Sequence, residues 1–299
     1  MCVSPIDGWR SAERSVTGKR AVVFDLRRGL HDRPVIVPCG RCIECRLRKK
    51  REWALRCQHE ASLHDENTLL VLTYDDEHLP ALGSLRKAHL SSFLKRLRSR
   101  SGKRFKFFAC GEYGGRFDRP HYHVLLFGLG FPDKVPGPER NGYKSWNSEV
   151  LDATWAQGIT EIGEVTFDGI AYVAKYITKK DDRDEGWLRA HGYEPEFIHM
   201  SRGGAKDRDG VVSRGIGYDW WKQFGNELLQ HDSVLLKGKE VSVPRYYDGL
   251  NETSEPEEVQ KIKAARQRCV DADEMRTPRL MSREKVLESA DSLFTGGSR

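Results

Sequence analysis

Two histidines separated by one residue, His121 and His123, begin an apolar run that is typical of a β-strand. Side chains of a strand alternate between its two faces, so both imidazoles share a face with Leu125. Residues 105–113 predict a partner strand, and the glycines between the two runs indicate a turn. In such a hairpin Glu112 lies beside the two imidazoles. Two neutral imidazoles and a carboxylate form a three-ligand set for a divalent metal ion.

Other interpretations of these residues stay open. A His-x-His pair is a short pattern that also arises by chance, and the two histidines are then exposed polar residues at the start of a strand. The third ligand is a separate question. Asp75 and Asp76 follow a neighbouring apolar strand, and either can replace Glu112 in the metal site.

A second unusual pattern lies in a predicted helix over residues 168–180. One stripe of this helix is apolar and is expected to face the core. The neighbouring stripe carries two phenols and two ammonium groups, from Tyr172, Lys175, Tyr176 and Lys179. A phenol, with an ordinary pKa of about 10, attacks phosphorus when cations or a metal ion favour its ionised form. The alternative is that both tyrosines only pack. Tyr246 and Tyr247 are a rival pair, but adjacent residues of an extended segment point in opposite directions.

A group of cysteines at x2 spacing opens a predicted helix over residues 43–63, and its members are Cys39, Cys42 and Cys45. Such spacing brings thiolates to one centre, and structural zinc is the ion that we expect there. The fourth ligand must come from elsewhere in the chain: Cys2 is the first choice, followed by Cys57 or His59. An iron–sulfur cluster uses similar spacing, but the usual fourth Cys-Pro is missing. Three reduced thiols in a turn are the remaining alternative.

Composition limits the classes of function. The 299 residues are 38% hydrophobic and 31% charged, which suits a soluble protein with a core, and no apolar run is long enough to span a membrane. The net charge of +6 is concentrated: residues 46–56 hold six basic residues and one acid, and residues 86–106 hold nine basic residues and no acid. This pattern favours nucleic acid as a partner. No GxxxxGK[ST] motif occurs, so no ATP site is predicted. Seven cysteines without a signal-peptide pattern indicate a reducing compartment.

The order of the predicted elements defines three parts of the chain. Residues 1–66 hold short strands, the cysteines and a basic helix. Residues 67–180 begin with a buried strand over 67–74, continue with a helix over 84–98 and the hairpin, and end with a helix over 150–157, a strand over 158–165 and the tyrosine helix. Residues 181–299 begin with a charged, Gly-rich linker and continue as a charged, mostly helical extension with a packed segment over 217–229.

The motifs, taken together, resemble a known superfamily. PHYHVLLFG is similar to the His-hydrophobe-His motif of the HUH endonucleases, and YVAKY is similar to their two-tyrosine motif. With LTYDDEHLP and CGRCIEC in the same order, the chain resembles the replication initiator proteins of gokushovirus-type microviruses, which are small single-stranded DNA phages. The resemblance implies an α+β fold, with a central antiparallel sheet of about five strands, helices packed on one face, and a mostly helical C-terminal extension.

The resemblance also implies a mechanism. His121 and His123 would hold Mg²⁺ or Mn²⁺, with Glu112 as the best third ligand. Tyr172 or Tyr176 would attack single-stranded origin DNA, leaving a 5′-phosphotyrosine and a free 3′-hydroxyl that primes a host DNA polymerase. The second tyrosine would act while the first is still linked to DNA. Lys175 would stabilise charge on the phosphate or the phenolate.

The same resemblance suggests the partners and the location. The protein would act in the host bacterial cytoplasm, with a host helicase as a further partner and no membrane. The basic helices would follow the DNA backbone, through Arg46, Arg48, Lys49, Lys50, Lys95, Arg96 and Lys179. Two competing functions are a zinc-containing nucleic-acid-binding protein that does not cleave, and a metal-dependent hydrolase that uses water as its nucleophile. A tyrosine–DNA adduct that survives denaturation distinguishes the proposed nickase from both.

Overall fold

The fold is seen in a computed structural model that describes residues 2–14, 20–115, 117–139, 142–176, 185–204, 214–269, 271, 273 and 276–296. The chain divides into two compact units. Residues 50–265 form the larger unit, and residues 1–49 together with 266–299 form the smaller one. The three functional parts expected from the sequence, 1–66, 67–180 and 181–299, stay a prediction.

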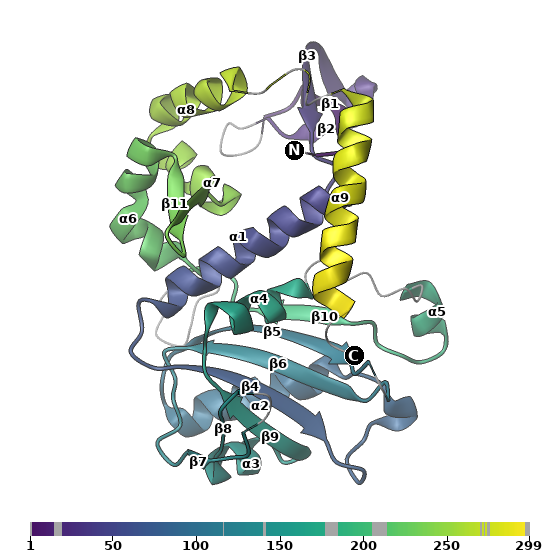
Figure 1. Cartoon of the computed structure of the whole chain (residues 1–299), viewed down its shortest axis with the longest axis vertical. Coiled ribbons are helices and arrows are strands. Elements are labelled where there is room, and N and C mark those ends of the chain that lie inside the picture. Colours follow the sequence, from purple (N-terminus) through teal and green to yellow (C-terminus); the bar gives the residue numbers. More distant parts are fainter. Residues whose placement is uncertain are drawn as a thin grey trace. The chain divides into compact units, whose positions relative to one another are not determined.

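A seven-stranded antiparallel sheet forms the centre of the larger unit (Figure 1). Its strand order is β10-β5-β6-β4-β9-β8-β7. The strands are β4 (Asn67–Tyr74), β5 (Lys106–Tyr113), β6 (Pro120–Phe127), β7 (Val135–Pro136), β8 (Ser145–Asn147), β9 (Gly158–Gly163) and β10 (Phe197–Met200). The α+β class with a central antiparallel sheet is therefore confirmed, with seven strands where the sequence suggested about five.

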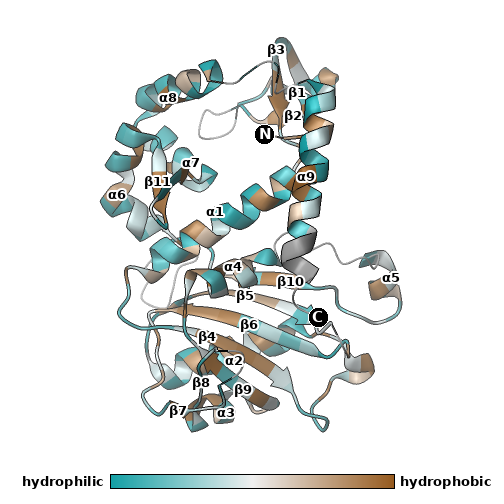
Figure 2. Cartoon of the chain, in the orientation of Figure 1, coloured by the Kyte–Doolittle hydropathy of each residue, from teal (hydrophilic) through white to brown (hydrophobic). Residues whose placement is uncertain are grey.

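Helices cover both faces of this sheet, whereas the sequence-based expectation placed them on one. The first face packs against α2 (Lys87–Ser101) and α3 (Glu149–Trp155), which bury Phe93 and Trp155 against Tyr74 and Tyr122 of the sheet. The second face packs against α4 (Phe167–Lys175) and the C-terminal part of α1 (Ile43–Ala61). Alternation of apolar side chains along β5 and β6 supplies both cores, and Figure 2 shows these strands largely in brown.

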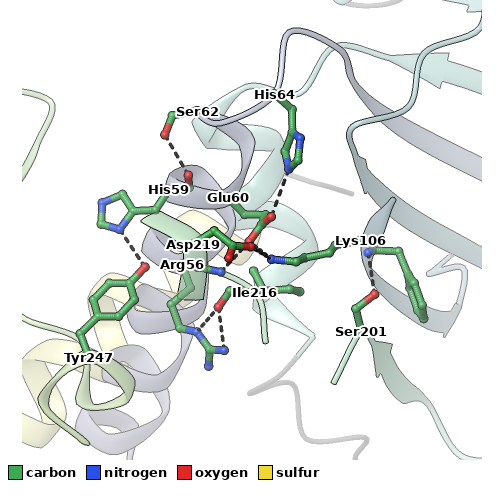
Figure 3. A network of polar contacts seen from close by, with 12 residues as sticks. Arg56, His59, Glu60, Ser62, His64, Lys106, Ser201, Ile216, Asp219 and Tyr247 are labelled. Atoms are coloured by element: carbon green, nitrogen blue, oxygen red, sulfur yellow. Dashed lines mark hydrogen bonds and ion pairs between the residues drawn. The ribbon is translucent and has the colours of Figure 1, made fainter. Parts of the chain in front are cut away.

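A buried ion network holds α1 and α6 (Tyr218–His231) to the second face of the sheet (Figure 3). Glu60 of α1 is 1% exposed, and its carboxylate accepts hydrogen bonds from Lys106 Nζ at 2.9 Å and from the Gly217 backbone at 2.8 Å. Lys106 Nζ also lies 2.7 Å from the carboxylate of Asp219. Losing one partner of such a buried pair costs about 3–5 kcal/mol, because the other charge is left without compensation.

The last part of the larger unit packs around α6. It contains β11 (Ser233–Leu236), β12 (Lys239–Ser242), α7 (Arg245–Ser254) and most of α8 (Pro256–Arg268). A small core of Leu228, Val234, Val243 and Tyr247 joins these elements. A short helix, α5 (Glu185–Ala190), precedes β10 in a region that the sequence predicted as a linker.

The smaller unit contains a three-stranded sheet of order β2-β1-β3. Its strands are β1 (Ile6–Ser11), β2 (Val22–Val23) and β3 (Gly29–Val37). The first residues of α1 and the helix α9 (Thr277–Gly296) complete this unit. Short 3-10 helices occur at Leu26–Arg28 here and at Ala81–Gly83 in the larger unit. Within the described residues, no helix is both long enough and apolar enough to cross a membrane.

Several expected elements form as predicted, and two differ. The strand at Asn67–Tyr74 has the expected bounds, and the helices α1, α3, α4 and α6 begin within about two residues of the predicted positions. The predicted N-cap Ser84 is wrong, because α2 begins at Lys87 and Ser84 instead accepts a hydrogen bond from the Glu194 backbone. The expected burial of Ala88 is also wrong, since this residue is exposed.

Candidate active site and metal centre

The β5–β6 hairpin sets the relative positions of the candidate metal ligands. Glu112 lies directly opposite His121 in the antiparallel register, and Cys110 lies opposite His123. Glu112, His121 and His123 therefore project from the same face, as the alternation of strand side chains predicted. This is the face of the sheet that α4 covers.

The three candidate ligand atoms meet at one point. Glu112 Oε1 lies 2.8 Å from Nε2 of His121 and 2.7 Å from Nε2 of His123. Glu112 is 3% exposed and His123 is 8% exposed, so the group lies at the edge of the core with His121 nearer to solvent. A carboxylate oxygen and two imidazole nitrogens at this spacing suit one divalent cation that keeps further positions for substrate oxygens.

A backbone carbonyl orients the first histidine. Nδ1 of His121 lies 3.1 Å from the Arg119 carbonyl oxygen, and a hydrogen bond there selects the tautomer whose Nε2 lone pair points toward Glu112. Burial alone would raise the pKa of Glu112. Its contacts with His121 and His123 outweigh burial and hold this pKa well below the usual range, so the carboxylate is ionised. An ionised carboxylate beside oriented imidazoles is the protonation state that binding of a metal ion requires.

Local sequence explains why α4 presents its tyrosines to this point. The Thr166 hydroxyl caps the helix by accepting from the Gly169 backbone at 3.1 Å, and Asp168 in the first turn complements the helix dipole. The apolar stripe of Ile170, Val173 and Ala174 is fully buried on the sheet. That packing turns the neighbouring stripe of the helix toward the histidines.

The two tyrosine hydroxyls lie together beside His123. The Tyr176 hydroxyl donates to the Tyr172 hydroxyl at 2.9 Å. The ring centroids of Tyr172 and Tyr176 lie 5.2 Å and 6.1 Å from that of His123, and Tyr172 is 42% exposed. The structure thus gathers the ligand triad and both phenols into one site. The predicted continuation of the helix past Tyr176 falls on residues 177–180, outside the described residues.

Electrostatics explains what these phenols lack when no cation is near. Burial and the negative charge of Glu112 raise the pKa of Tyr176 above its ordinary value, and the same two causes raise the pKa of Tyr172. A positive charge beside Glu112 would reverse the second cause. Lys175, the last residue of α4, is partly buried between the two tyrosines in sequence.

The alternative carboxylates are engaged elsewhere. Asp75 accepts from the His78 backbone at 2.8 Å, and Asp76 lies 2.7 Å from an Arg119 nitrogen. Among the described residues, neither joins the group formed by Glu112 and the two histidines. Glu112 is therefore the third candidate ligand that the geometry favours.

The rival tyrosines pack in the core around α7. Tyr247 is fully buried and lies 3.0 Å from Nδ1 of His59, while the ring of Tyr246 lies under the guanidinium of Arg56 at 3.8 Å. Both tyrosines lie in the first turn of a helix, so the extended segment that we assumed for them from the sequence is wrong. Their packing contacts give them a structural explanation.

The cysteine group forms a second candidate metal centre, in the smaller unit. Sγ of Cys2 lies 3.5 Å from Sγ of Cys39 and 3.8 Å from Sγ of Cys42, and all four candidate sulfurs, including that of Cys45, lie within 4.8 Å of one another. Burial opposes ionisation of Cys39, but backbone hydrogen bonds outweigh it and lower the pKa to about 6. Cys2 therefore occupies the position that was expected of the fourth ligand.

The two alternatives for that position lie in the larger unit. Cys57 is fully buried in the core between α1 and the sheet, where burial raises its pKa. His59 stacks on Trp220 with ring centroids 3.6 Å apart.

The basic residues expected to bind DNA have different environments. Arg96 donates to the carbonyl oxygens of Thr154 and Trp155 at 2.9 and 3.1 Å, so its guanidinium caps the end of α3 and supports the fold. Arg48 lies 3.9 Å from the sulfur of Cys45. Lys49 and Lys95 are exposed, and Arg46 and Lys50 are partly buried. Lys179 lies outside the described residues.

Sequence patterns gave no indication of a hollow at the tip of the β5–β6 hairpin. This cavity of about 310 Å³ is lined by aromatic and aliphatic residues of the hairpin turn, of the 79–83 segment and of α5. Phe117 and Trp187 are 78% and 51% exposed at its rim, and the wall includes Arg119, whose carbonyl orients His121. The signal was absent because the lining residues come from three distant segments.

Comparison with known proteins gives consistent results. A family model for replication-associated proteins of the ORF2 type matches residues 67–181, a segment that contains the ligand triad and both tyrosines of α4. The replication-associated protein VP4 of Bdellovibrio phage phiMH2K is 34% identical over 234 residues, which cover 74% of this chain and 69% of the relative. The replication-associated protein ORF2 of Spiroplasma virus 4 is 34% identical over 226 residues, covering 71% of this chain and 66% of the relative.

A third relative extends the set. The replication-associated protein ORF4 of Chlamydia phage 1 is 29% identical over 224 residues, covering 72% of this chain and 53% of the relative. No solved structure matches the chain. The extent of the match to the Bdellovibrio phage protein, together with the family model over the candidate site, establishes that this chain belongs to the ORF2-type family of replication-associated proteins.

Proposed function

We propose that this protein is a replication initiator that nicks single-stranded origin DNA and later rejoins the displaced strand. In the proposed reaction a tyrosine oxygen attacks the scissile phosphorus, forms a 5′-phosphotyrosine and releases a 3′-hydroxyl for a host polymerase. The observation that carries the proposal is the convergence of Glu112, His121 and His123 with the hydroxyls of Tyr172 and Tyr176. Membership of the replication-associated family supports the same conclusion.

The ligand set fits a catalytic Mg²⁺ or Mn²⁺. One ionised carboxylate and two imidazoles, with their free positions on the solvent side, provide a mixed oxygen and nitrogen set on one face of a cation. When bound, such an ion supplies Lewis acidity at a phosphate oxygen and favours ionised phenol. The role of this chain is to hold the three ligands rigidly on adjacent strands, with His121 fixed by the Arg119 carbonyl.

The proposed nucleophiles are Tyr172 and Tyr176. Their hydroxyls lie 2.9 Å apart, so one phosphate bound at the triad is within reach of either oxygen after a small side-chain movement. A pair of equivalent nucleophiles suits a reaction in which a new origin is cut while the first DNA end is still attached. Lys175 is proposed to stabilise negative charge that develops on the phosphate or on the phenolate.

The substrate that fits best is a single strand. The triad lies in a partly buried site between a helix and a sheet, where a flexible single strand positions its phosphate more readily than a duplex does. The exposed rings of Trp187 and Phe117 border a hollow near the ligands, and aromatic rings of this kind stack on bases without strong sequence preference. Lys49, Lys50 and Lys95 are proposed to contact phosphates, together with Arg46, Arg48 and Lys179, whereas Arg96 is not.

The competing functions share parts of this site. A binding protein that does not cleave would use the basic residues and the hollow, and a metal-dependent hydrolase would use the triad with water as nucleophile. Neither requires the hydroxyls of Tyr172 and Tyr176 beside His123. The geometry therefore favours tyrosine attack over both alternatives.

A cleavage assay on a denaturing gel tests the proposal. Labelled single-stranded oligonucleotides tiled across the genome that encodes this chain are incubated with the protein and Mn²⁺. We expect one oligonucleotide to yield a shortened product and a protein-linked product that survives denaturation. The double variant Tyr172→Phe/Tyr176→Phe should yield no linked product, while the control Tyr143→Phe, which changes an exposed tyrosine, should react normally. Cleavage without any linked product would contradict tyrosine attack and favour the hydrolase.

A further inference from the structure

Four cysteine sulfurs meet in the smaller unit, and none of these cysteines belongs to the site proposed to cleave DNA. They come from three segments: Cys2 precedes β1, Cys39 follows β3, and Cys42 and Cys45 belong to the start of α1. The pairing of Ile6 with Val37 places the beginning of β1 beside the end of β3. This pairing brings Cys2 to Cys39 although they are 37 residues apart in the sequence.

The spacing of these sulfurs matches a mononuclear tetrahedral site. Four sulfurs bound at about 2.3 Å to one zinc ion lie about 3.8 Å from one another. The distances from Cys2 Sγ to Cys39 Sγ and Cys42 Sγ are 3.5 and 3.8 Å, and no pair within the group exceeds 4.8 Å. An iron–sulfur cluster binds its cysteines through different iron atoms and holds their sulfurs further apart. A disulfide is excluded for these four residues, which are free thiols.

Backbone groups around the sulfurs favour thiolates. Cys39 Sγ accepts from the backbone N–H groups of Arg41 and Cys42 at 3.4 and 3.3 Å, and Cys2 Sγ accepts from that of Cys39 at 3.2 Å. Gly40 makes the first two contacts possible, because its φ of +75° turns the chain back toward Cys39. The Arg48 guanidinium near Cys45 offsets part of the negative charge of four thiolates.

The smaller unit also needs a constraint of this kind. Among its described residues, the buried hydrophobic residues are Cys2, Ile43, Cys45 and Leu280, so half of them are cysteines of the group. Large apolar side chains of its sheet region are exposed instead, with Phe24 at 60% and Ile36 at 70%. A unit with so small an apolar core folds stably when a metal ion or another cross-link joins its segments.

We infer that Cys2, Cys39, Cys42 and Cys45 bind one Zn²⁺ through four thiolates, and that this ion holds the β1–β3 sheet to the first turn of α1. The site is structural, since four protein ligands fill the tetrahedron and leave no position for substrate. Binding of zinc is then part of the folding of the smaller unit. This inference does not depend on the proposed cleavage reaction.

Metal content of the full-length protein tests the inference directly. We expect about one zinc ion per chain by elemental analysis after dialysis against a buffer without chelator. Replacing the zinc by Co²⁺ should give the strong visible absorption of tetrahedral cobalt bound to thiolates. The variant Cys42→Ser should lose the metal, whereas the control Cys269→Ser, which changes an exposed cysteine outside the group, should keep it.

Thermal unfolding gives a second readout that does not involve DNA. A thiol-competing chelator should lower the unfolding temperature of the wild-type protein by about 10 °C or more, and should hardly affect Cys42→Ser protein that has already lost its zinc. If Cys42→Ser does not fold, the wild-type metal content still decides the matter. Wild-type protein that contains less than about a tenth of a zinc ion per chain, or iron with sulfide, would overturn the inference.

Discussion

Glu112 is the carboxylate that the described residues place with the two histidines, so its replacement by glutamine tests the metal site most sharply. Glutamine keeps the shape of the side chain and an oxygen that accepts from both imidazoles, but it removes the negative charge. Because that side chain is 3% exposed, water cannot replace the lost charge. We therefore expect the fold to persist while metal affinity falls.

The size of the loss follows from simple electrostatics. Two unit charges 4 Å apart attract by about 4 kcal/mol at an effective dielectric constant of 20, as found near protein surfaces. A divalent ion in contact with Oε1 of Glu112 is more highly charged and closer. The loss is thus at least about 4 kcal/mol, which corresponds to roughly a thousandfold weaker binding at about 1.4 kcal/mol per factor of ten.

Titration with Mn²⁺, followed by electron paramagnetic resonance of the free ion, measures this affinity without DNA. Asp75→Asn is the matched control, because it removes a carboxylate at the end of the adjacent strand β4 whose partner is His78. We expect wild-type affinity in the control and a loss of about a thousandfold in Glu112→Gln. Equal affinity in wild type and Glu112→Gln, or a loss in Asp75→Asn, would refute the proposed ligand set.

Three further predictions concern the remaining parts of the site. His121→Ala and His123→Ala should each abolish nicking and leave circular dichroism unchanged; full cleavage by the double variant would remove the metal from the mechanism. Arg96→Ala should lower stability by about 1–3 kcal/mol, because it leaves two carbonyls at the end of α3 without their donor, whereas Lys95→Ala should weaken DNA binding and its salt dependence with no loss of stability; denaturant titration and binding at two salt concentrations distinguish these outcomes, and the reverse assignment would contradict them. Tyr247→Phe should cost about 1 kcal/mol through the lost hydrogen bond in the α7 core and leave cleavage intact, so a loss of cleavage in stably folded protein would return this tyrosine to the candidates.

Local patterns predicted the part of the site that lies on one hairpin. His121 and Glu112 were placed on one face because strand alternation is a local property and the turn between the strands is short. The apolar stripe of α4 was equally readable, since its buried residues recur at helical spacing. That the tyrosines of this helix meet the histidines was inferred only from a family resemblance, because the contact joins residues about fifty positions apart.

Features that depend on distant partners were missed. The strand β10, Phe197–Met200, pairs with β5 at the edge of the sheet, but its four residues carry no strong pattern and lie in a segment that looked like a linker. The α7 helix has a weak helical sequence and depends on packing against α1 and α6, so Tyr246 and Tyr247 were assigned to an extended segment. Arg96 looked like a DNA contact because the carbonyls that it caps come from α3, 58 residues away.

Mapping of the covalent bond tests the central claim most directly. Wild-type protein is allowed to cleave its single-stranded target with Mn²⁺, the DNA is digested to a short nucleotide remnant, and the modified peptide is sequenced by mass spectrometry. The account predicts that the remnant is attached through a phosphate to Tyr172 or Tyr176 and moves wholly to the other tyrosine when one is changed to Phe. Attachment to Tyr246, Tyr247 or any residue outside α4 and its C-cap would contradict it.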